Sequence, residues 1–542
     1  MPSFATGNPL QLILRDRKEH LKANLPLFDT AATRGIEQAA QAMLPPHTLM
    51  QRAGLSSARL AMAMAPHADS FWIACGPGNN GGDGFEAALH LKQWGKSPIV
   101  TGLGAPAKTP LDAAQSRQRA IDAGVAFADS PPAQFDFCID AILGIGASNA
   151  RSGRDIEGDM ATWIALINSS SARVLAVDVP TGLHADTGIA NAICVRANAT
   201  LSLMTLKPGL FTANGRDACG EIWLDALVEL DAFDTQDSNY LRAMGEPSAW
   251  LASAPIAQAR AHATHKGSYG DVLVIGGAPG MTGAALLAAT AALQFGAGRV
   301  FVMLLDGGST AVDFTQPELM FRPYHEPLFA DQFKSDFANA TVVCGCGGGS
   351  AVRGPLHTIL ASNANAVLDA DALNAMAYNK TLSKLLSERA ARKAKTVLTP
   401  HPLEAARLLT VTTQEVQQNR LAAATALARQ FNCTVVLKGS GTVIAAPGKS
   451  AVINPTGNAL LASAGTGDVL AGMVGARLAG LEGLKGLAKL AHQSVGHEAT
   501  DSATFQAVCE AVYLHGKAAD QWPAHRALTA SSLARAVCEG IF

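Results

Sequence analysis

A strand that ends in a glycine-rich loop and continues into an apolar helix occurs in both halves of this chain. In the first half, "SFWIAC" leads into "GPGNNGGDG" and then into "FEAALHLKQWG". In the second half, "DVLVIGG" leads into "APGMTGAALLAATAALQF". A strand followed at once by a helix and another strand is typical of a βαβ unit, which requires a parallel sheet covered by helices. The pattern therefore predicts a parallel α/β fold in each half.

Three more apolar segments continue this alternation in the first half after "SFWIAC", and four more follow "DVLVIGG" and its helix in the second half. Between about residues 225 and 262 the alternation fades into short polar clusters, which are typical of a linker. A length of 542 residues also exceeds what one hydrophobic core usually supports. We therefore predict two domains, at 25–235 and 245–542, the first of them doubly wound.

The charge balance indicates small-molecule partners. The chain has 42 basic and 44 acidic residues, a net charge of -2, so it lacks the basic surplus typical of proteins that bind nucleic acid or anionic membranes. The uncharged stretch 272–298 is interrupted by glycines and Pro279, which favours a buried strand, loop and helix over a membrane span. We expect no nucleic acid and no membrane partner, and a homo-oligomer.

Nine scattered cysteines favour a reducing compartment over a disulfide framework. The N-terminal "LQLILRDRKEH" is too short an apolar run for a signal peptide. Both observations predict a cytoplasmic protein. Cys344 and Cys346 lie close together, but no second pair or histidine cluster accompanies them, and both are interpreted as loop or core residues.

Polar residues follow the first-half strands where each of them ends. Asp140 and Asp178 each close an apolar run, Thr181 follows on the same turn, and Asn79, Asn80 and Asp83 belong to the first glycine loop. Ligands of doubly wound sheets collect beyond the carboxyl ends of the strands, so these loops are predicted to converge on one site. The alternatives are a tight structural turn and aspartates that cap the following helices.

The second half carries a pattern typical of phosphoryl transfer. "AGTGD" places Asp468 just ahead of a helix whose N-terminal amides can bind phosphate. The loop "LKGSGTV" after a strand is typical of a nucleotide clamp, and "LTPHPLE" offers His401 and Glu404 at the same edge. A lone histidine is more often structural, so His401 is interpreted as a substrate contact only. Neither "WGKSP" nor "PGKSA" has the first glycine of a P-loop.

The ordered series "LMQRAG", "NNGGDG", "DAILGIG", "DVPTGLHADTG", "HKGSYGDVLVIGG", "LTPHPLEAARLL", "LKGSGT", "NPTGN" and "AGTGD" resembles the bifunctional NAD(P)H-hydrate repair enzymes. The resemblance covers nearly all the chain after about residue 25. It implies an N-terminal Rossmann-like epimerase domain and a C-terminal ribokinase-like, ADP-dependent or ATP-dependent dehydratase domain. Such enzymes interconvert the R and S hydrates of NADH and NADPH, and they dehydrate the S form after phosphorylating its C6 hydroxyl.

For the epimerase, the resemblance implies that Asp178 is the acid/base and that Asn80, Asp140 and Thr181 bind a potassium ion. The hydrate would contact Asn79, Asn80, Gly81, Gly82, Asp83, Gly144, Ile145, Gly146, Ala147, Ser148, Asn149, Ala150 and Asp178.

For the dehydratase, the resemblance implies that Asp468 is the base, and that magnesium accompanies the ADP or ATP. The S hydrate would contact Ala284, Gly349, His401 and Asp468, and the nucleotide would contact Lys438, Gly439, Ser440, Gly441, Thr442 and Gly467.

Some positions depart from the family pattern. "GCGGG" stands where "GPG" is frequent, Ile145 replaces a common threonine, Leu403 a common glycine, and Thr181 a more usual serine. None of these changes removes a proposed catalytic group. Two alternatives remain open at this point: a ribokinase-like kinase of vitamin precursors, and a protein that senses nicotinamide nucleotides without converting them.

Overall fold

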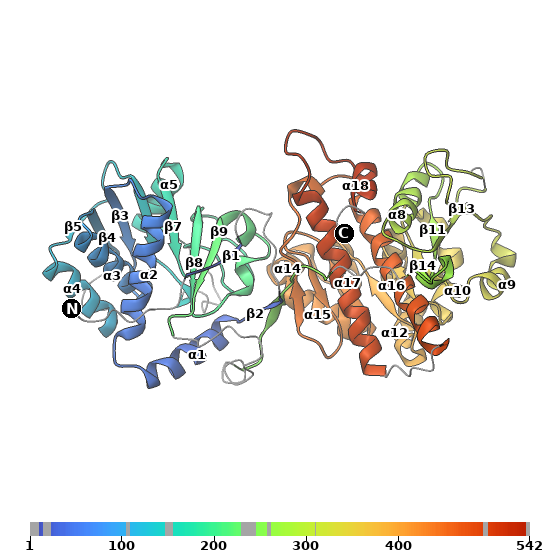
Figure 1. The fold of residues 1–542 in the computed structure, drawn as a ribbon, viewed down its shortest axis with the longest axis horizontal. Helices are drawn as coiled ribbons and strands as arrows, with labels where there is room; N and C mark the ends of the chain where they lie inside the picture. Colours follow the sequence, from blue (N-terminus) through green and yellow to red (C-terminus); the bar gives the residue numbers. More distant parts are fainter. Residues whose placement is uncertain are drawn as a thin grey trace. The chain divides into compact units, whose positions relative to one another are not determined.

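The computed structural model describes residues 10–14, 23–104, 109–146, 156–228, 245–256, 262–308, 311–490 and 497–537. The chain divides into two compact units, whose main parts are Pro26–Trp250 and Leu251–Phe542 (Figure 1). The two-part α/β fold predicted from the sequence is confirmed. Within the segment 225–262, which was expected to be a linker, the structure has strand β10 (Ala249–Leu251).

The first unit contains an eight-stranded sheet in the order β1-β9-β8-β7-β6-β3-β4-β5. All its neighbouring strands are parallel except β1 and β9. Its strands are β1 (Gln11–Leu14), β3 (Ser70–Cys75), β4 (Ser97–Gly102), β5 (Ala126–Ala128), β6 (Phe137–Ala141), β7 (Arg173–Val177), β8 (Ala199–Leu203) and β9 (Glu221–Asp225).

Helices cover both faces of this sheet, so the side chains on both faces of β3 are buried. Phe71 and Ile73 pack into one core with residues of helices α1, α2 and α3, whereas Trp72 packs into another core with Trp163 of α5. The helices of this unit are α1 (Thr30–Met43), α2 (Thr48–Met64), α3 (Asn79–Gln93), α4 (Leu111–Asp122), α5 (Gly158–Ser169) and α6 (Gly215–Ala218), with the 3₁₀ helix η3 (Pro208–Leu210). This arrangement is a doubly wound fold.

The second sheet has eleven strands in the order β13-β12-β11-β14-β15-β16-β17-β18-β19-β10-β2, of which β11 to β19 belong wholly to the second unit. It is parallel from β13 to β17 and antiparallel from β17 to β19. Its strands are β2 (Leu25–Leu27), β10, β11 (Asp271–Gly276), β12 (Arg299–Leu304), β13 (Met320–Phe321), β14 (Thr341–Cys344), β15 (Ala366–Leu368), β16 (Thr396–Leu398), β17 (Thr434–Leu437), β18 (Val443–Ala445) and β19 (Ala451–Ile453).

Helices α8 and α16 pack closely together in the second unit. A Cβ atom on Gly472 of α16 would lie 2.0 Å from the carbonyl oxygen of Ala288 in α8, so glycine permits this approach. The helices are α8 (Thr282–Gln294), α9 (Glu326–Asp336), α10 (Arg353–Ala361), α11 (Ala370–Ala377), α12 (Lys380–Glu388), α13 (Pro402–Leu409), α14 (Thr413–Gln418), α15 (Arg420–Phe431), α16 (Thr466–Leu490), α17 (His497–Asp520) and α18 (Ala530–Ala536), with the 3₁₀ helices η4 (Lys266–Tyr269), η5 (Gly349–Val352), η6 (Ala390–Arg392) and η7 (Ala459–Leu461).

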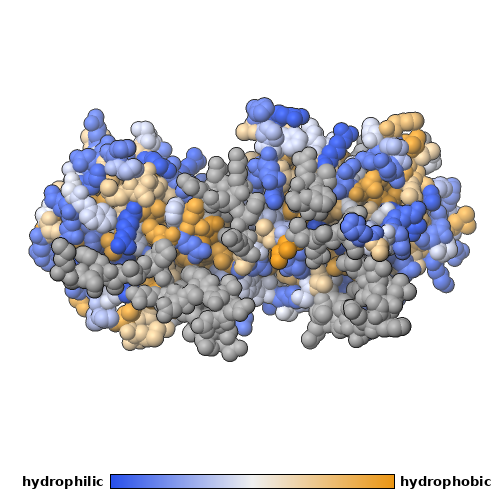
Figure 2. Space-filling view, in the orientation of Figure 1, coloured by the Kyte–Doolittle hydropathy of each residue, from blue (hydrophilic) through white to orange (hydrophobic). Residues whose placement is uncertain are grey.

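The uncharged stretch 272–298 forms strand β11, a loop and helix α8, as predicted. Among the described residues, no helix combines the length and the apolar character that a bilayer crossing needs. On the face shown in Figure 2, each unit shows hydrophilic residues interspersed with hydrophobic ones.

Candidate active sites

Each sheet has a point where the strand order reverses. In the first sheet β3 lies between β4 and β6, and in the second β11 lies between β12 and β14. The loops after two such neighbouring strands diverge to opposite faces and leave a crevice for a ligand. The first group of candidate residues lies at the first of these points. In the second group, Ala284 and Gly349 follow β11 and β14 at the reversal, whereas His401 and the loop 438–442 follow β16 and β17 farther along the sheet.

A cavity of about 1070 Å³ opens at the reversal point of the first unit. Asn79, Asn80 and Asp83 line it from the first turns of α3, which replace the loop expected there. Gly144, Ile145, Gly146 and Asp178 line it from the loops after β6 and β7. Ala147, Ser148, Asn149 and Ala150 lie outside the described residues. The convergence predicted for the described residues is thus found.

Gly81 and Gly82 do not line the cavity. Because they have no side chain, they allow the first turns of α3 to pack against Gly76 and Met50. A Cβ atom on Gly81 would lie 2.0 Å from the carbonyl oxygen of Gly76, and one on Gly82 would lie 2.5 Å from the sulfur of Met50. These glycines therefore shape the site through the backbone and do not lie at its surface.

We expect the change Gly81→Ala to lower the free energy of unfolding by about 1–3 kcal/mol, because the new methyl group meets a backbone carbonyl that cannot turn away. Urea unfolding of wild type and variant measures the difference. Gly35→Ala is the matched control, since nothing lies within 4 Å of its Cβ position. Equal stability of Gly81→Ala and wild type would contradict the packing role.

Asp178 forms an ion pair with Lys207, a residue that the sequence analysis did not identify. Lys207 Nζ lies 2.5 Å from Asp178 Oδ1 and also donates to Ser202 Oγ and the carbonyl oxygen of Leu203. The ammonium group is fully buried. Asp178 Oδ2 accepts a hydrogen bond from the Ile145 amide at 3.0 Å, and the aspartate has a φ of 67°. Asp178 is therefore held in an unusual backbone conformation with both carboxylate oxygens oriented.

Asp140 and Thr181 form a buried pair. The amide and hydroxyl groups of Thr181 donate to the two Asp140 oxygens at 2.8 and 2.7 Å, and Asp140 lies within strand β6 and not at the start of a described helix. Burial raises the pKa of Asp140 to about 6, against the opposing effect of these bonds. Asn80 lies beside Gly144, and its buried Nδ2 has no hydrogen-bond partner among the described residues. The carboxylate, hydroxyl and amide oxygens of Asp140, Thr181 and Asn80 are ligands of the type that a potassium ion prefers.

Two further carboxyl groups lie in this cavity. Burial, and then the charge of Asp178, raises the pKa of Glu37, which the sequence analysis did not identify. Burial also raises the pKa of Asp83 well above its usual range, with Asp178 and Glu37 as the next causes. The site thus combines a lysine-paired carboxylate with a carboxyl group that favours its protonated form, a combination suited to acid–base chemistry.

In the second unit, Asp468 lies in the first turn of α16 and not ahead of the helix. Burial raises its pKa to about 6, and the nearby Asp369 adds to that shift. Asp369 is almost completely buried at the end of β15, where Thr399 Oγ1 and Lys438 Nζ donate to its Oδ1 at 2.8 and 2.7 Å. Asp369 was not among the residues predicted from the sequence.

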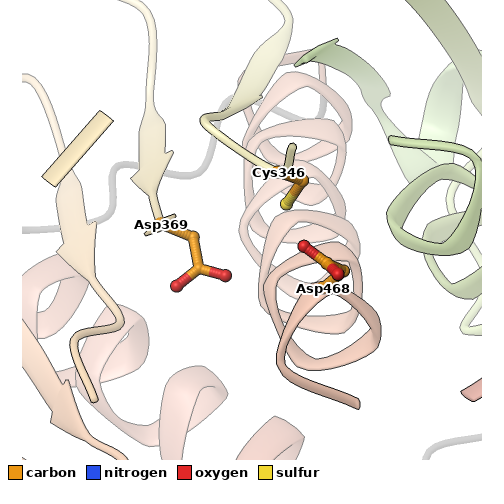
Figure 3. Close-up of side chains that lie close together, drawn as sticks. All are labelled: Cys346, Asp369 and Asp468. Atoms are coloured by element: carbon orange, nitrogen blue, oxygen red, sulfur yellow. The ribbon is translucent and has the colours of Figure 1, made fainter. Parts of the chain in front are cut away.

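Figure 3 shows the Asp369 and Asp468 carboxylates and the Cys346 thiol turned toward one another. The ligand atoms of the three side chains lie within 4.8 Å of one another. Cys344 is a core residue as predicted, whereas Cys346 takes part in this cluster. The loop-or-core interpretation of Cys346 was therefore incomplete.

The loop 438–442 follows β17, as predicted, and meets the start of α16. A Cβ atom on Gly467 would lie 3.2 Å from Lys438 Nζ, which places the ammonium group beside the helix N-terminus. Gly439 has a φ of 138°, and the buried Arg420 donates to the Leu437 and Lys438 carbonyl oxygens. The lysine, the helix amides and Asp468 together form a site suited to a phosphoryl group.

Ala284 and Gly349 also lie at the second reversal point. A Cβ atom on Gly347, two residues before Gly349, would lie 2.9 Å from the Cβ of Ala284. Gly349 has a φ of 53°, and its amide donates to Asp371 Oδ2 at 2.8 Å.

His401 has a structural role that its interpretation as a substrate contact did not include. Its Nδ1 accepts from the Leu403 and Glu404 amides at 3.1 and 3.4 Å, and Glu404 Oε2 accepts from the His401 amide at 2.8 Å. This is a capping box at the start of α13. Burial raises the pKa of Glu404 to about 7 and lowers that of His401.

His515 contacts the first residue of α16, since its Nε2 lies 2.9 Å from the Thr466 carbonyl oxygen. Burial lowers the pKa of His515 to about 4. As the pH falls, the unfolded chain, in which His515 has its ordinary pKa, binds a proton at this histidine before the folded protein does. The free energy of unfolding should therefore fall by about 2 kcal/mol between pH 7 and pH 5. The change His515→Gln should remove that part of the pH dependence, measured by urea unfolding at both pH values. An unchanged dependence in the variant would contradict the assignment.

Comparisons with known proteins give matches over both units. Residues 46–209 match the family model described as YjeF-related protein N-terminus, and residues 272–539 match that described as NAD(P)H-hydrate dehydratase. The bifunctional NAD(P)H-hydrate repair enzyme of Coxiella burnetii is 34% identical, over 84% of this chain and 90% of the relative. That of Escherichia coli is 34% identical, over 82% and 83%.

The solved structures that resemble the chain include the ADP/ATP-dependent NAD(P)H-hydrate dehydratase from Bacillus subtilis, co-crystallized with ATP/Mg²⁺. It is 29% identical, covers 53% of this chain and 93% of its own, and has a TM-score of 0.40.

Proposed function

This chain belongs to the family of bifunctional NAD(P)H-hydrate repair enzymes, and from that membership we propose that it restores hydrated NADH and NADPH in two steps. An epimerase domain, 25–235, interconverts the R and S hydrates. A dehydratase domain, 245–542, converts the S hydrate to NADH or NADPH and consumes ADP or ATP. The expected homo-oligomer and cytoplasmic location stay predictions.

In the epimerase site, the different environments of Asp178 and Asp83 assign one of them the role of base and the other the role of acid. Asp178, paired with Lys207, accepts a proton from the hydrate. Asp83, whose raised pKa favours the protonated form, donates one as the bonds at C6 rearrange. Asn80, Asp140 and Thr181 would hold a potassium ion, which supplies a fixed positive charge for the ligand oxygens. The loop 144–150 completes the contacts with the hydrate.

In the dehydratase site, Asp468 removes the proton of the C6 hydroxyl while that oxygen attacks the terminal phosphorus of the nucleotide. Lys438 and the amides of Gly467 and the first turn of α16 stabilise the charge that develops on the phosphoryl oxygens. The lone pair of the ring nitrogen then expels phosphate, which leaves more readily than hydroxide, and loss of a proton from C5 restores the C5=C6 double bond. Asp369 offers an oxygen ligand of the kind that Mg²⁺ prefers, and bound Mg²⁺ would neutralise phosphate charge.

The observation that supports this most is that Asp468, Lys438 and Gly467 lie close together beyond the parallel strands of one unit, on a chain whose other unit carries a second acid–base site. A vitamin-precursor kinase would leave that second site unexplained.

The test is to add purified protein and ADP or ATP to mixed R and S NADH hydrates and to follow the absorbance of the reduced nicotinamide. We expect nearly complete recovery with wild type, and recovery that stops with the R form remaining for Asp178→Asn. No recovery with either nucleotide would refute the proposal.

A further inference from the structure

The cluster of Cys346, Asp369 and Asp468 brings three potential metal ligands together from three separate elements. Cys346 follows β14, Asp369 follows β15, and Asp468 lies in the first turn of α16. Their ligand atoms lie within 4.8 Å of one another and point into a shared space (Figure 3). Among the described residues, this is the one such group of cysteine, histidine and acidic side chains.

The two deepest members of the cluster are aimed into it and are shielded from water. Cys346 has no exposed surface, and its thiol has no hydrogen-bond partner outside the cluster among the described residues. The hydrogen bonds that Asp369 accepts from Thr399 and Lys438 both end at Oδ1, so Oδ2 remains for a ligand inside the cluster.

The charges of the cluster complement a divalent cation. Two carboxylates and a thiolate carry three negative charges, and Lys438, bonded to Asp369, offsets one of them. A divalent ion would neutralise the rest, and its binding would release the thiol proton to solvent. Magnesium takes oxygen ligands only, whereas zinc-like ions bind thiolate and carboxylate together. The cysteine therefore changes which metal this group of carboxylates prefers.

We propose that Cys346, Asp369 and Asp468 form an inhibitory site for a thiophilic divalent cation of the Zn²⁺ class. The ion occupies the carboxylate of Asp468, so that this residue no longer accepts the substrate proton. Its inhibitory effect rests on the proposed role of Asp468, whereas binding of the ion does not.

Binding is tested first with Co²⁺ alone, added to the full chain without hydrate or nucleotide. A Co²⁺–thiolate bond gives a charge-transfer band in the near ultraviolet. We expect this band in wild type and in Cys344→Ala, a neighbouring buried cysteine, and we expect Zn²⁺ to displace it. We expect no band in Cys346→Ser or in Cys346→Ala, which is the second variant if serine prevents folding. The absence of the band in wild type, or its survival without Cys346, would overturn the site.

Inhibition is tested with Zn²⁺ at buffered free concentrations during dehydration. Wild type should be inhibited and should recover when a chelator removes the ion. Cys346→Ser should need at least about tenfold more Zn²⁺ for the same inhibition. Equal sensitivity of wild type and Cys346→Ser would overturn the inhibitory role. The Co²⁺ band requires no turnover. A missing band therefore shows that the metal site is wrong, whereas a band without any dehydration shows that the proposed repair activity is wrong.

Discussion

Replacing Asp468 with asparagine is expected to slow nucleotide-dependent dehydration by about 10²–10⁴-fold, because the amide has nearly the same shape but cannot accept the hydroxyl proton. The site remains otherwise intact, since the neighbouring pair of Lys438 and Asp369 does not depend on Asp468. The nucleotide and the S hydrate should therefore still bind. The measurement is the initial rate of recovery of the reduced nicotinamide with saturating ADP or ATP.

The control for this change is Asp336→Asn, an exposed aspartate at the end of α9 that should leave the rate unchanged. Epimerisation provides an internal control, because it takes place in the other unit. Exchange between R and S hydrates, followed by nuclear magnetic resonance without nucleotide, should continue at the wild-type rate in Asp468→Asn. A dehydration rate within a few fold of wild type would remove Asp468 from the role of base.

The change Lys207→Met should lower the free energy of unfolding of its unit by about 3–5 kcal/mol, because it leaves the Asp178 carboxylate without its buried partner. It should also abolish epimerisation, since without Lys207 the Asp178 carboxylate loses the ion pair that orients it toward the substrate. Urea unfolding and R–S exchange measure the two effects.

The double change Lys207→Met with Asp178→Asn separates these two effects. Removing both charges should restore most of the stability, because no isolated charge remains buried. Epimerisation should remain absent, because the base is gone. If the double variant is as unstable as Lys207→Met, the lysine stabilises the unit through packing and not through its ion pair.

The sequence predicted the fold and the principal acidic residues because both depend on local patterns. Alternating strands and helices predicted the parallel sheets, and a carboxylate at the end of an apolar run was enough to identify Asp140 and Asp178. Asp468 was identified because a glycine-threonine loop precedes it at a helix start.

Lys207, Asp369 and Glu37 were missed because their roles depend on contacts between distant segments. Lys207 meets Asp178 only because β8 lies beside β7, and Asp369 meets Lys438 across 69 positions of the chain. A single charged residue within an apolar stretch, such as the lysine in "TLKPGL", is the signal that could have identified Lys207. For His401, the glutamate three residues later already indicated a helix cap.

The left-handed backbone of Asp178 determines which substitutions can isolate its chemistry. Side chains with a Cβ atom rarely adopt a φ of 67°, but asparagine does so more readily than most. An alanine there would remove the carboxylate and also favour a different path for the loop 178–181, so lost activity would have two causes. Alanine scanning would therefore exaggerate the importance of this charge, whereas asparagine keeps the backbone and reports on the carboxylate alone.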